Sequence, residues 1–250
     1  MLFDRLYHKD EVTHAVIWII AYVVLASVAD GISQDVGIVK LATAPVLVVL
    51  SVALWAWVSH AGLREAYGLT APCATAAHML WYLPLAILAT KKLWFGVTMG
   101  GTALECALFV VSMCCAGFLE EVIFRGLLFR GMEKSNRTSA IVVSSLTFGM
   151  GHIVNAFNAS GQTLPVTLAQ IVFAVSVGFV LVFVLLKCGS IWPCVVFHAV
   201  NNALAIFEDE AAQVALFGSY SQAMLVTLGT SLAIVALYVL YLMRLPDADA

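Results

Sequence analysis

The sequence predicts an all-α fold, a polytopic membrane bundle of about eight transmembrane helices. Of the 250 residues, 62% are hydrophobic and only 11% are charged, and the mean hydropathy is +1.00. A soluble domain of this length is usually about half apolar and about a quarter charged. The apolar residues also form runs near the roughly 20 residues that a helix needs to cross a bilayer.

Polar or glycine-containing breaks divide the chain into eight expected spans. They cover residues 13–29, 41–58, 78–90, 102–129, 139–157, 164–186, 190–207 and 214–243. The third span is short and contains Pro84, which predicts a kinked or partly inserted helix. The fourth and eighth are long enough to extend beyond the membrane. We expect residues 1–250 to form a single membrane domain, with the functional motifs on the helices of residues 102–207.

The charges indicate how the bundle lies in the membrane. The N-terminus is too polar for a signal peptide, so we expect the first span to be retained. If successive spans alternate in direction, nine Lys and Arg residues lie on the side of the N-terminus and three on the other. The first group is Arg5, Lys9, Arg64, Arg125, Arg130, Lys134, Arg137, Lys187 and Arg244, and the second is Lys40, Lys91 and Lys92. The positive-inside rule then predicts an integral, multi-pass protein with both termini in the cytoplasm.

Composition also limits the classes of partner that the protein is expected to bind. The net charge is −3 and no Lys/Arg cluster of the kind that binds phosphates appears, so we expect the lipid bilayer and no nucleic acid as a partner. The cysteines form no CxxC pair and most lie in apolar runs, which is typical of small buried side chains rather than of a disulfide framework. They are Cys73, Cys106, Cys114, Cys115, Cys188 and Cys194.

The charged residues of the fourth span indicate a polar site inside the membrane. The stretch "GFLEEVIFRGLLFR" sets Glu120 and Glu121 side by side in an apolar run. Glu121 and Arg125 are four residues apart on a helix, which favours an ion pair that supports the structure. Glu120 points about 100° away from Glu121 and has no partner on its own helix. A buried glutamate of this kind suits a general acid or base.

Two histidines follow in later spans. His152 lies in "LTFGMGHIVNAFN", where Gly149 and Gly151 permit the close approach of another helix or of a substrate. His198 and Asn202 are four residues apart in "SIWPCVVFHAVNNALAIF", so they share a helix face as two hydrogen-bond donors. Further polar side chains in these spans are Asn155, Asn158 and Asn201, the last a weaker candidate for the face of His198.

A shared depth argues that these residues form one site. Taken alone, a histidine on an apolar helix is usually a packed core residue, and a His–Asn pair can simply join two helices. At a rise of about 1.5 Å per residue from the expected helix ends, Glu120 lies roughly 15 Å deep, His152 roughly 18 to 22 Å and His198 roughly 12 Å. We therefore expect these residues, with Asn202, to line one water-accessible cavity near mid-membrane.

In this order the motifs resemble those of the CPBP family of intramembrane glutamic-type proteases. The family is named for CAAX prenyl proteases and bacteriocin-processing proteins and is also called the ABI family. "EEVIFR" fits Glu-Glu-x-x-x-Arg, "FGMGH" fits Phe-x-x-x-His and "HAVNN" fits His-x-x-x-Asn. Each motif alone is weak, but three in order on membrane helices are a specific signal. The resemblance covers about residues 120–207, and the eight-helix fold of the family agrees with the span count.

The resemblance implies an intramembrane endopeptidase acting on a membrane-associated substrate. That substrate would be a CAAX-type peptide, a leader peptide or a segment of another membrane protein. The resemblance also implies that Glu120 and His152 activate water, and that His198 and Asn202 stabilise the oxyanion. The supporting positions are Glu121 and Arg125. Amide hydrolysis needs both a base for water and donors for the tetrahedral intermediate, so the residue types suit the reaction.

Two alternatives accompany this hypothesis. No cofactor is expected, but Glu120, His152 and His198 could instead hold zinc with water as the fourth ligand. Against zinc, HExxH is absent and Asn202 is a poorer zinc ligand than oxyanion donor. The other alternative is a non-catalytic membrane immunity or scaffold protein of the same fold. A transporter is disfavoured, because no second half repeats the polar helices.

Overall fold

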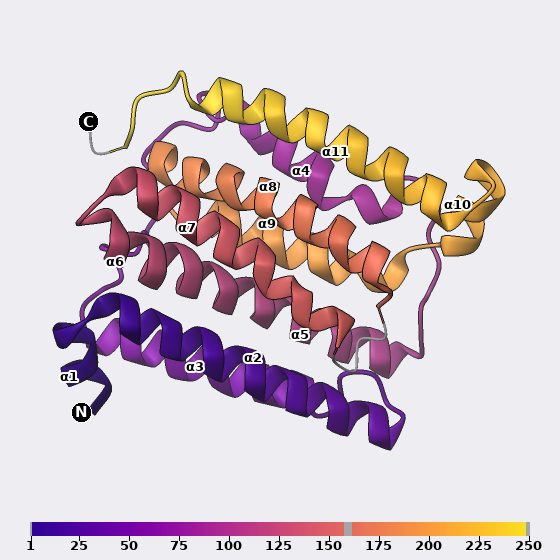
Figure 1. Ribbon diagram of the computed structural model, residues 1–250, viewed down its shortest axis with the longest axis horizontal. Helices are drawn as coiled ribbons and strands as arrows, with labels where there is room; N and C mark the ends of the chain where they lie inside the picture. Colours follow the sequence, from indigo (N-terminus) through magenta and orange to yellow (C-terminus); the bar gives the residue numbers. More distant parts are fainter. Residues whose placement is uncertain (1, 158–161, 249–250) are drawn as a thin grey trace.

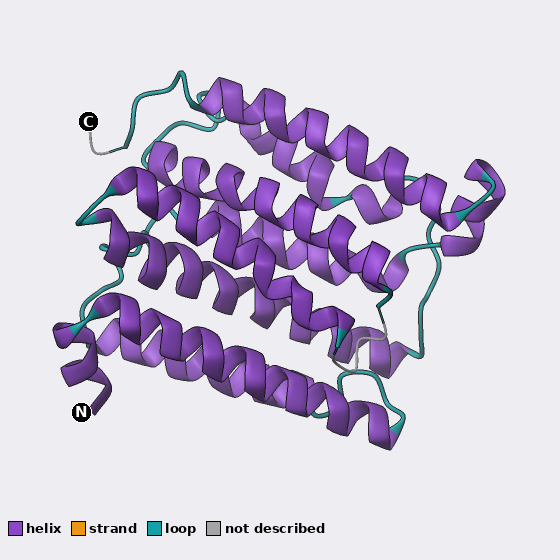
Figure 2. Cartoon of the chain, in the orientation of Figure 1, coloured by secondary structure: helices purple, strands orange, loops and turns teal. Residues whose placement is uncertain are grey.

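The computed structural model describes residues 2–157 and 162–248, and every regular element in these ranges is helical (Figure 2). Strand-like pairing in the described residues is limited to an isolated bridge between Val97 and Glu208. The predicted all-α class is therefore confirmed. The longer helices are α2 (Glu11–Val36), α3 (Thr43–His60), α5 (Ala103–Glu121), α7 (Arg137–Met150), α8 (Leu164–Cys188), α9 (Trp192–Ala203) and α11 (Tyr220–Leu242). The shorter elements are α1 (Leu2–Lys9), η1 (Leu80–Tyr82), α4 (Leu83–Ala89), η2 (Lys91–Leu93), η3 (Val122–Phe129), α6 (Arg130–Glu133), η4 (Gly151–Ala156), η5 (Leu204–Phe207) and α10 (Glu210–Phe217).

Within the described residues, six helical segments are long and apolar enough to cross a membrane. They are Glu11–Val36, Thr43–His60, Ala103–Glu133, Arg137–Ala156, Leu164–Cys188 and Tyr220–Leu242. The other two predicted spans are shorter apolar helices, Leu80–Ala89 and Trp192–Phe207. The multi-pass bundle is thus confirmed, and the count of eight holds only if the two shorter helices are included.

Local backbone geometry explains why two of the predicted spans differ from the observed helices. Pro84 stands in the first turn of α4, and the three residues before that helix have left-handed backbones with φ of 51°, 54° and 55°. This shortens the third span, as expected for a proline near a helix start. The expected eighth span is divided in two, because Gly218 ends α10 at φ 83° and Ser219 caps the start of α11.

The helices form three layers (Figure 1). The hairpin of α2 and α3 covers one side of the bundle, α4 and α11 cover the opposite side, and α5, α7, α8 and α9 lie between them. In the middle layer α5 packs against α9 and α7 packs against α8. These four helices, with η3 and η4, carry all three motifs, so the candidate site lies at the centre of the bundle.

Glycines allow the central helices to approach closely. A Cβ added at Gly117 of α5 would lie 2.7 Å from the backbone nitrogen of Ala199 in α9. A Cβ at Gly149 of α7 would lie 2.6 Å from the backbone nitrogen of Val175 in α8. Only glycine fits such contacts, which bring helix backbones together. The close approach of another helix is confirmed at Gly149, whereas Gly151 has open space and lines the cavity. The approach of a substrate at Gly151 stays a prediction.

The fourth predicted span changes its winding directly after the glutamate pair. The helix runs for 31 residues, from Ala103 to Glu133, as its apolar length predicts. However, α5 ends at Glu121, and residues Val122–Phe129 wind as a π-helix before α6. All residues of this π segment are buried. Such segments are rare and often lie at functional sites.

Both chain termini lie at the same end of the bundle, together with α6, whereas α10 lies at the other end (Figure 1). The C-terminal segment is held there by Asp247, which pairs with Lys187 at 2.7 Å and also with Arg137. Burial opposes ionisation of Asp247, but the hydrogen bonds from Lys187 and Arg137 outweigh it and lower the pKa of the carboxyl.

The cysteines are all free, as expected from the sequence. Cys106, Cys188 and Cys194 are buried and Cys115 is half-buried, whereas Cys73 and Cys114 are exposed. The expectation of burial is wrong for these two residues. An apolar run in a membrane helix predicts a lipid-facing side as well as a packed one, and Cys114 lies on the outer side of α5. Cys73 lies in the loop before η1.

Candidate active site

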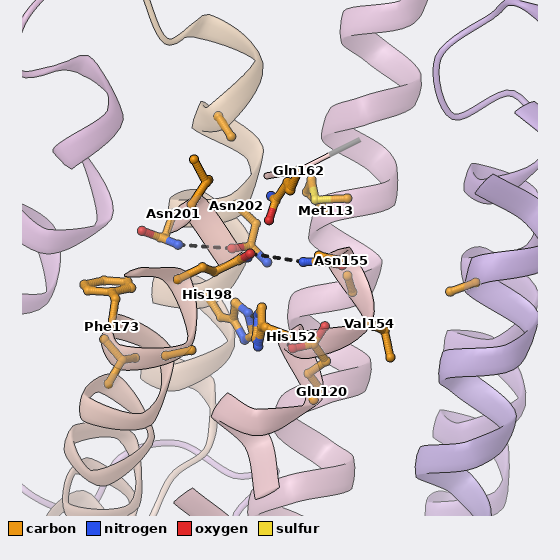
Figure 3. Close-up of a pocket in the computed structure, with 18 of the residues that line it drawn as sticks. Met113, Glu120, His152, Val154, Asn155, Gln162, Phe173, His198, Asn201 and Asn202 are labelled. Atoms are coloured by element: carbon orange, nitrogen blue, oxygen red, sulfur yellow. Dashed lines mark hydrogen bonds and ion pairs between the residues drawn. The ribbon is translucent and has the colours of Figure 1, made fainter. Parts of the chain in front are cut away.

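A cavity of about 1250 Å³ lies between α2 on one side and α5, η4, α8 and α9 on the other. The side chains that line it include Glu120, His152, His198 and Asn202, which Figure 3 shows gathered at its centre. The structure thus brings together the four residues that the motifs indicated. From these residues the lining continues to the end of the bundle that carries Lys40, Lys91 and Lys92.

Glu120 lies on the last turn of α5 and faces the cavity. Its Oε1 accepts a hydrogen bond of 2.5 Å from the hydroxyl of Tyr22 in α2. Its Oε2 lies 3.5 Å from Nε2 of His198. The Glu120 side chain is 13% exposed. The carboxylate is therefore held from two sides while it stays accessible from the cavity.

Glu121 and Arg125 form the buried clamp, which lies behind the cavity wall. Arg125 donates to Oε1 of Glu121 at 3.2 Å, and both side chains are 0% exposed. Nδ1 of His198 lies 2.8 Å from the same oxygen. The expected ion pair is present. Because a buried charge is costly unless it is paired, each member of the buried clamp depends on the other.

Phe148 connects the buried clamp to both histidines. The guanidinium carbon of Arg125 lies 4.1 Å from the centre of the Phe148 ring. The rings of His152 and His198 meet the same ring edge-on, at centre distances of 5.6 and 5.4 Å. A cation over a ring face and edge-to-face rings are both favourable. The aromatic residue of the second motif therefore orients the charged side chains around it.

His152 lies just after the end of α7, where the α-helix changes to a 3-10 turn. α7 ends at Met150, and His152 lies in the 3-10 turn η4 rather than on the regular α-helix that the apolar run predicts. Its Nδ1 lies 3.2 Å from the carbonyl oxygen of Phe148. A carbonyl only accepts, so Nδ1 carries the hydrogen, and Nε2 of the neutral ring is free to accept a proton.

His198 lies between the two glutamates. Nδ1 donates to Glu121 and Nε2 faces Glu120. With Nδ1 already a donor, Nε2 can donate only when the ring is protonated. His198 can therefore act as a hydrogen-bond donor toward the cavity as an imidazolium, whose charge the two carboxylates would balance.

Asn202 is oriented by its neighbour. Nδ2 of Asn201 donates to Oδ1 of Asn202 at 3.0 Å, and both side chains line the cavity (Figure 3). Because the oxygen of Asn202 accepts this bond, its NH₂ group is the part that can donate to a substrate. Nearby on the wall, Asn155 donates to Gln170 at 3.1 Å. Asn158 lies outside the described residues.

Tyr22 is the site residue that the sequence did not indicate. It belongs to the first hundred residues, where no motif was recognised, yet its hydroxyl contacts the carboxylate of Glu120. The available signal was its position. The Tyr22 hydroxyl lies within an apolar span, roughly 17 Å from the start of α2 at the rise of an α-helix, which is the depth expected for the motif residues.

The metal alternative has no matching ligand group. Among the described residues, no three His, Cys, Asp or Glu side chains lie together as a metal site requires. This holds for Glu120, His152 and His198, the set that zinc would use. Both nitrogens of His198 face carboxylates instead. Catalysis without metal remains a prediction.

Residues 102–204 match the family model of the Rce1-like proteins, described as type II CAAX prenyl endopeptidases. The match covers less than half of the chain and includes all the motif residues, from Glu120 to Asn202. It confirms the family resemblance drawn from the three motifs, and with it the assignment of the chain as a peptidase. No curated protein and no solved structure matches the chain.

Proposed function

We propose that the chain is an intramembrane endopeptidase that hydrolyses a peptide bond of a membrane-associated substrate, a CAAX-type or leader peptide, without a metal. The observation that carries the proposal is the arrangement of a carboxylate, two histidines and an amide around one cavity inside the helix bundle. The Rce1-like match supports the reaction class.

The first step forms the tetrahedral intermediate. A water molecule between Glu120 and His152 attacks the scissile carbonyl carbon while Glu120 takes its proton, and the carbonyl electron pair moves onto oxygen. Nε2 of His152 is an acceptor and holds the water in line. The Tyr22 hydrogen bond fixes the Glu120 carboxylate so that little reorganisation is needed during the attack.

The second step breaks the C–N bond. The NH₂ group of Asn202 and the protonated His198 donate to the oxyanion, and the loss of one such donor typically costs about 100- to 1000-fold in rate. As the C–N bond breaks, the proton held by Glu120 passes to the leaving nitrogen. The products are a free amine and a carboxylic acid, which then loses its own proton, and Glu120 is again a carboxylate.

The membrane orientation is also a proposal. The positive-inside rule favours both termini in the cytoplasm, because most Lys and Arg residues lie at the end of the bundle that carries the termini. The cavity extends toward the other end, which carries Lys40, Lys91 and Lys92.

Comparative membrane proteomics tests the function directly. Membranes of cells with the unchanged protein and with Glu120→Gln are compared for new peptide termini. We expect termini that depend on Glu120, since the amide cannot take a proton from water. Equal sets of termini in the two strains would favour the non-catalytic scaffold.

Chelation tests the metal-free mechanism. The purified protein in detergent is treated with a strong chelator and assayed on a substrate found by proteomics. We expect cleavage to persist. Activity that disappears on chelation and returns with stoichiometric zinc would assign Glu120, His152 and His198 as ligands instead.

A further inference from the structure

We propose that Lys91 anchors the C-terminal carboxylate of the peptide substrate, and is therefore a specificity-determining residue. This inference rests on the proposed peptidase function. Lys91 lines the same cavity as Glu120. Its Nζ lies 2.8 Å from the centre of the Phe173 ring. Figure 3 shows Phe173 in the cavity lining, on the side of Asn201.

Lys91 differs from the other two lysines of the cavity. Lys40 pairs with Asp30 at 2.7 Å, and Lys92 pairs with Glu208 at 2.5 Å. Lys91 has no carboxylate partner among the described residues, and its contact is the ring face of Phe173. Two of the three lysines thus have a counter-charge within the protein, and Lys91 is the one whose counter-charge a ligand could supply.

The backbone joins the segment of Lys91 to the helix that carries Asn202. Its segment η2 packs against η5, which directly continues the helix of Asn202. The strand-like stretch after η2 is fixed to η5 by two hydrogen bonds, from Thr98 to Phe207 at 3.0 Å and from Gly100 to Ile206 at 2.9 Å. A Cβ at Gly100 would lie 2.5 Å from the Ile206 oxygen, so this close contact requires glycine.

The environment of Lys91 favours an anionic ligand. Burial, and after it the neighbouring Lys92, lowers the pKa of Lys91, while Glu208 acts in the opposite direction. A carboxylate placed against the amine would reverse this effect, and a charge-assisted hydrogen bond between them is stronger than a neutral one. The ring face of Phe173 stabilises the ammonium without neutralising it.

The C-terminal carboxylate is the anion that fits this position. A CAAX sequence is the last four residues of a chain, so a bond that is cut inside it has at most three residues between it and the terminus. Three extended residues span about 10 Å, so the terminus and the bond that breaks can lie in the same cavity. An enzyme that anchors this carboxylate selects chain ends and excludes internal sequences of the same composition.

The experiment compares two probes that differ in one group. They are a farnesylated peptide that ends in a CAAX sequence with a free carboxylate, and the same peptide with a C-terminal amide. Binding is measured on the full-length protein in lipid nanodiscs in the Glu120→Gln background, which prevents turnover. We expect the acid to bind about 10- to 150-fold more tightly, the range for a hydrogen bond to a charged group.

Two lysine variants then locate the effect. Lys91→Met should weaken binding of the acid to the level of the amide and leave the amide unchanged. Lys40→Met is the matched control, because this cavity lysine is already paired with Asp30 and lies on a different segment, and it should keep the preference for the acid. The comparison of acid and amide on the protein with Lys91 intact does not depend on how either variant folds.

Equal affinities for the two peptides, or no binding of either, would overturn the assignment. So would a Lys91→Met variant that weakens both peptides equally, which is also the result expected if Lys91 holds a lipid headgroup. The proposed function is judged separately, by cleavage with Glu120 intact. A peptide that binds with the acid preference but is never cleaved would contradict the peptidase and leave the Lys91 anchor in place.

Discussion

The cavity wall and the buried clamp carry neighbouring glutamates in opposite environments. Glu120 on the wall is 13% exposed and is held by Tyr22 at 2.5 Å, from a helix of the outer layer. Glu121 in the buried clamp is 0% exposed and is shared by Arg125 and His198. One step along the chain therefore separates a carboxylate that can meet water from one that cannot.

Helix geometry produces this difference. Successive side chains on an α-helix point about 100° apart. One side of α5 is sealed against α9 through Gly117, and the side of Glu120 is open to the cavity. Adjacent acidic residues can therefore be divided between chemistry and support without any difference in residue type. The predictions below test this division, from the largest expected effect to the smallest.

Glu120→Gln should remove catalysis and keep the fold. General base catalysis contributes about 100- to 10,000-fold, and the amide has the same shape but does not accept the proton. We expect turnover to fall by that factor, with the affinity for substrate and the melting temperature unchanged. A quenched fluorescent peptide and a thermal unfolding curve measure the two quantities. A Glu120→Gln protein with full turnover would end the assignment of Glu120 as the base.

Glu121→Gln should have the opposite profile. It leaves the charge of Arg125 buried without a counter-charge, and breaking a buried pair typically costs about 3–5 kcal/mol of stability. We expect lower expression and a lower midpoint of unfolding, while the molecules that fold keep more turnover than Glu120→Gln. The division would be wrong if Glu121→Gln were as stable as the unchanged protein and inactive, because Glu121 would then belong to the catalytic set.

Tyr22→Phe should have a smaller effect that is confined to catalysis. It removes one hydrogen bond to a charged group, which is worth about 1.5–3 kcal/mol, or roughly 10- to 150-fold in rate. Since Tyr22 positions the base and need not touch substrate, kcat should fall while KM stays constant. Tyr82→Phe, a tyrosine outside the cavity lining, is the control. A change in KM alone would instead indicate that Tyr22 contacts substrate.

The smallest effect on activity is expected from cysteine labelling. It decides which side of the membrane the cavity end with Lys91 faces. A cysteine at Lys134 should react from the cytoplasm, and one at Glu208, Asp209 or Glu210 from the opposite side. This result would place the cavity end that carries Lys91 on the non-cytoplasmic side. The reverse orientation would contradict the positive-inside prediction.

The sequence predicted the parts of the site that depend on spacing along a single helix. The pair of Glu121 and Arg125, and the position of His198 and Asn202 on one face, follow from four-residue spacing. The contacts of Tyr22 and Lys91 come from segments outside the motifs and depend on how the layers pack. The 3-10 turn at His152 could not be predicted either, because an apolar run looks the same for a regular helix and for a tightened one.

The exposed cysteines show a second limit of prediction from the sequence. Hydropathy predicts that Cys114 lies in a span, and this is correct. It does not tell a lipid-facing position from a packed one, because both environments are apolar. Only the helix partners decide that, and the packing of α5 against α3 and α9 leaves Cys114 outside.

The π segment Val122–Phe129 makes the number of residues in the fourth helix as important as their identity. A chain shorter by one residue there could wind as an uninterrupted α-helix. One residue added, or one lost without such rewinding, would rotate everything after the segment by about 100° relative to Glu120. The salt bridge from Arg130 to Glu133 at 2.7 Å would turn with it, away from its present neighbours. Insertions and deletions should therefore be tolerated in the loops between helices and rejected in these eight positions.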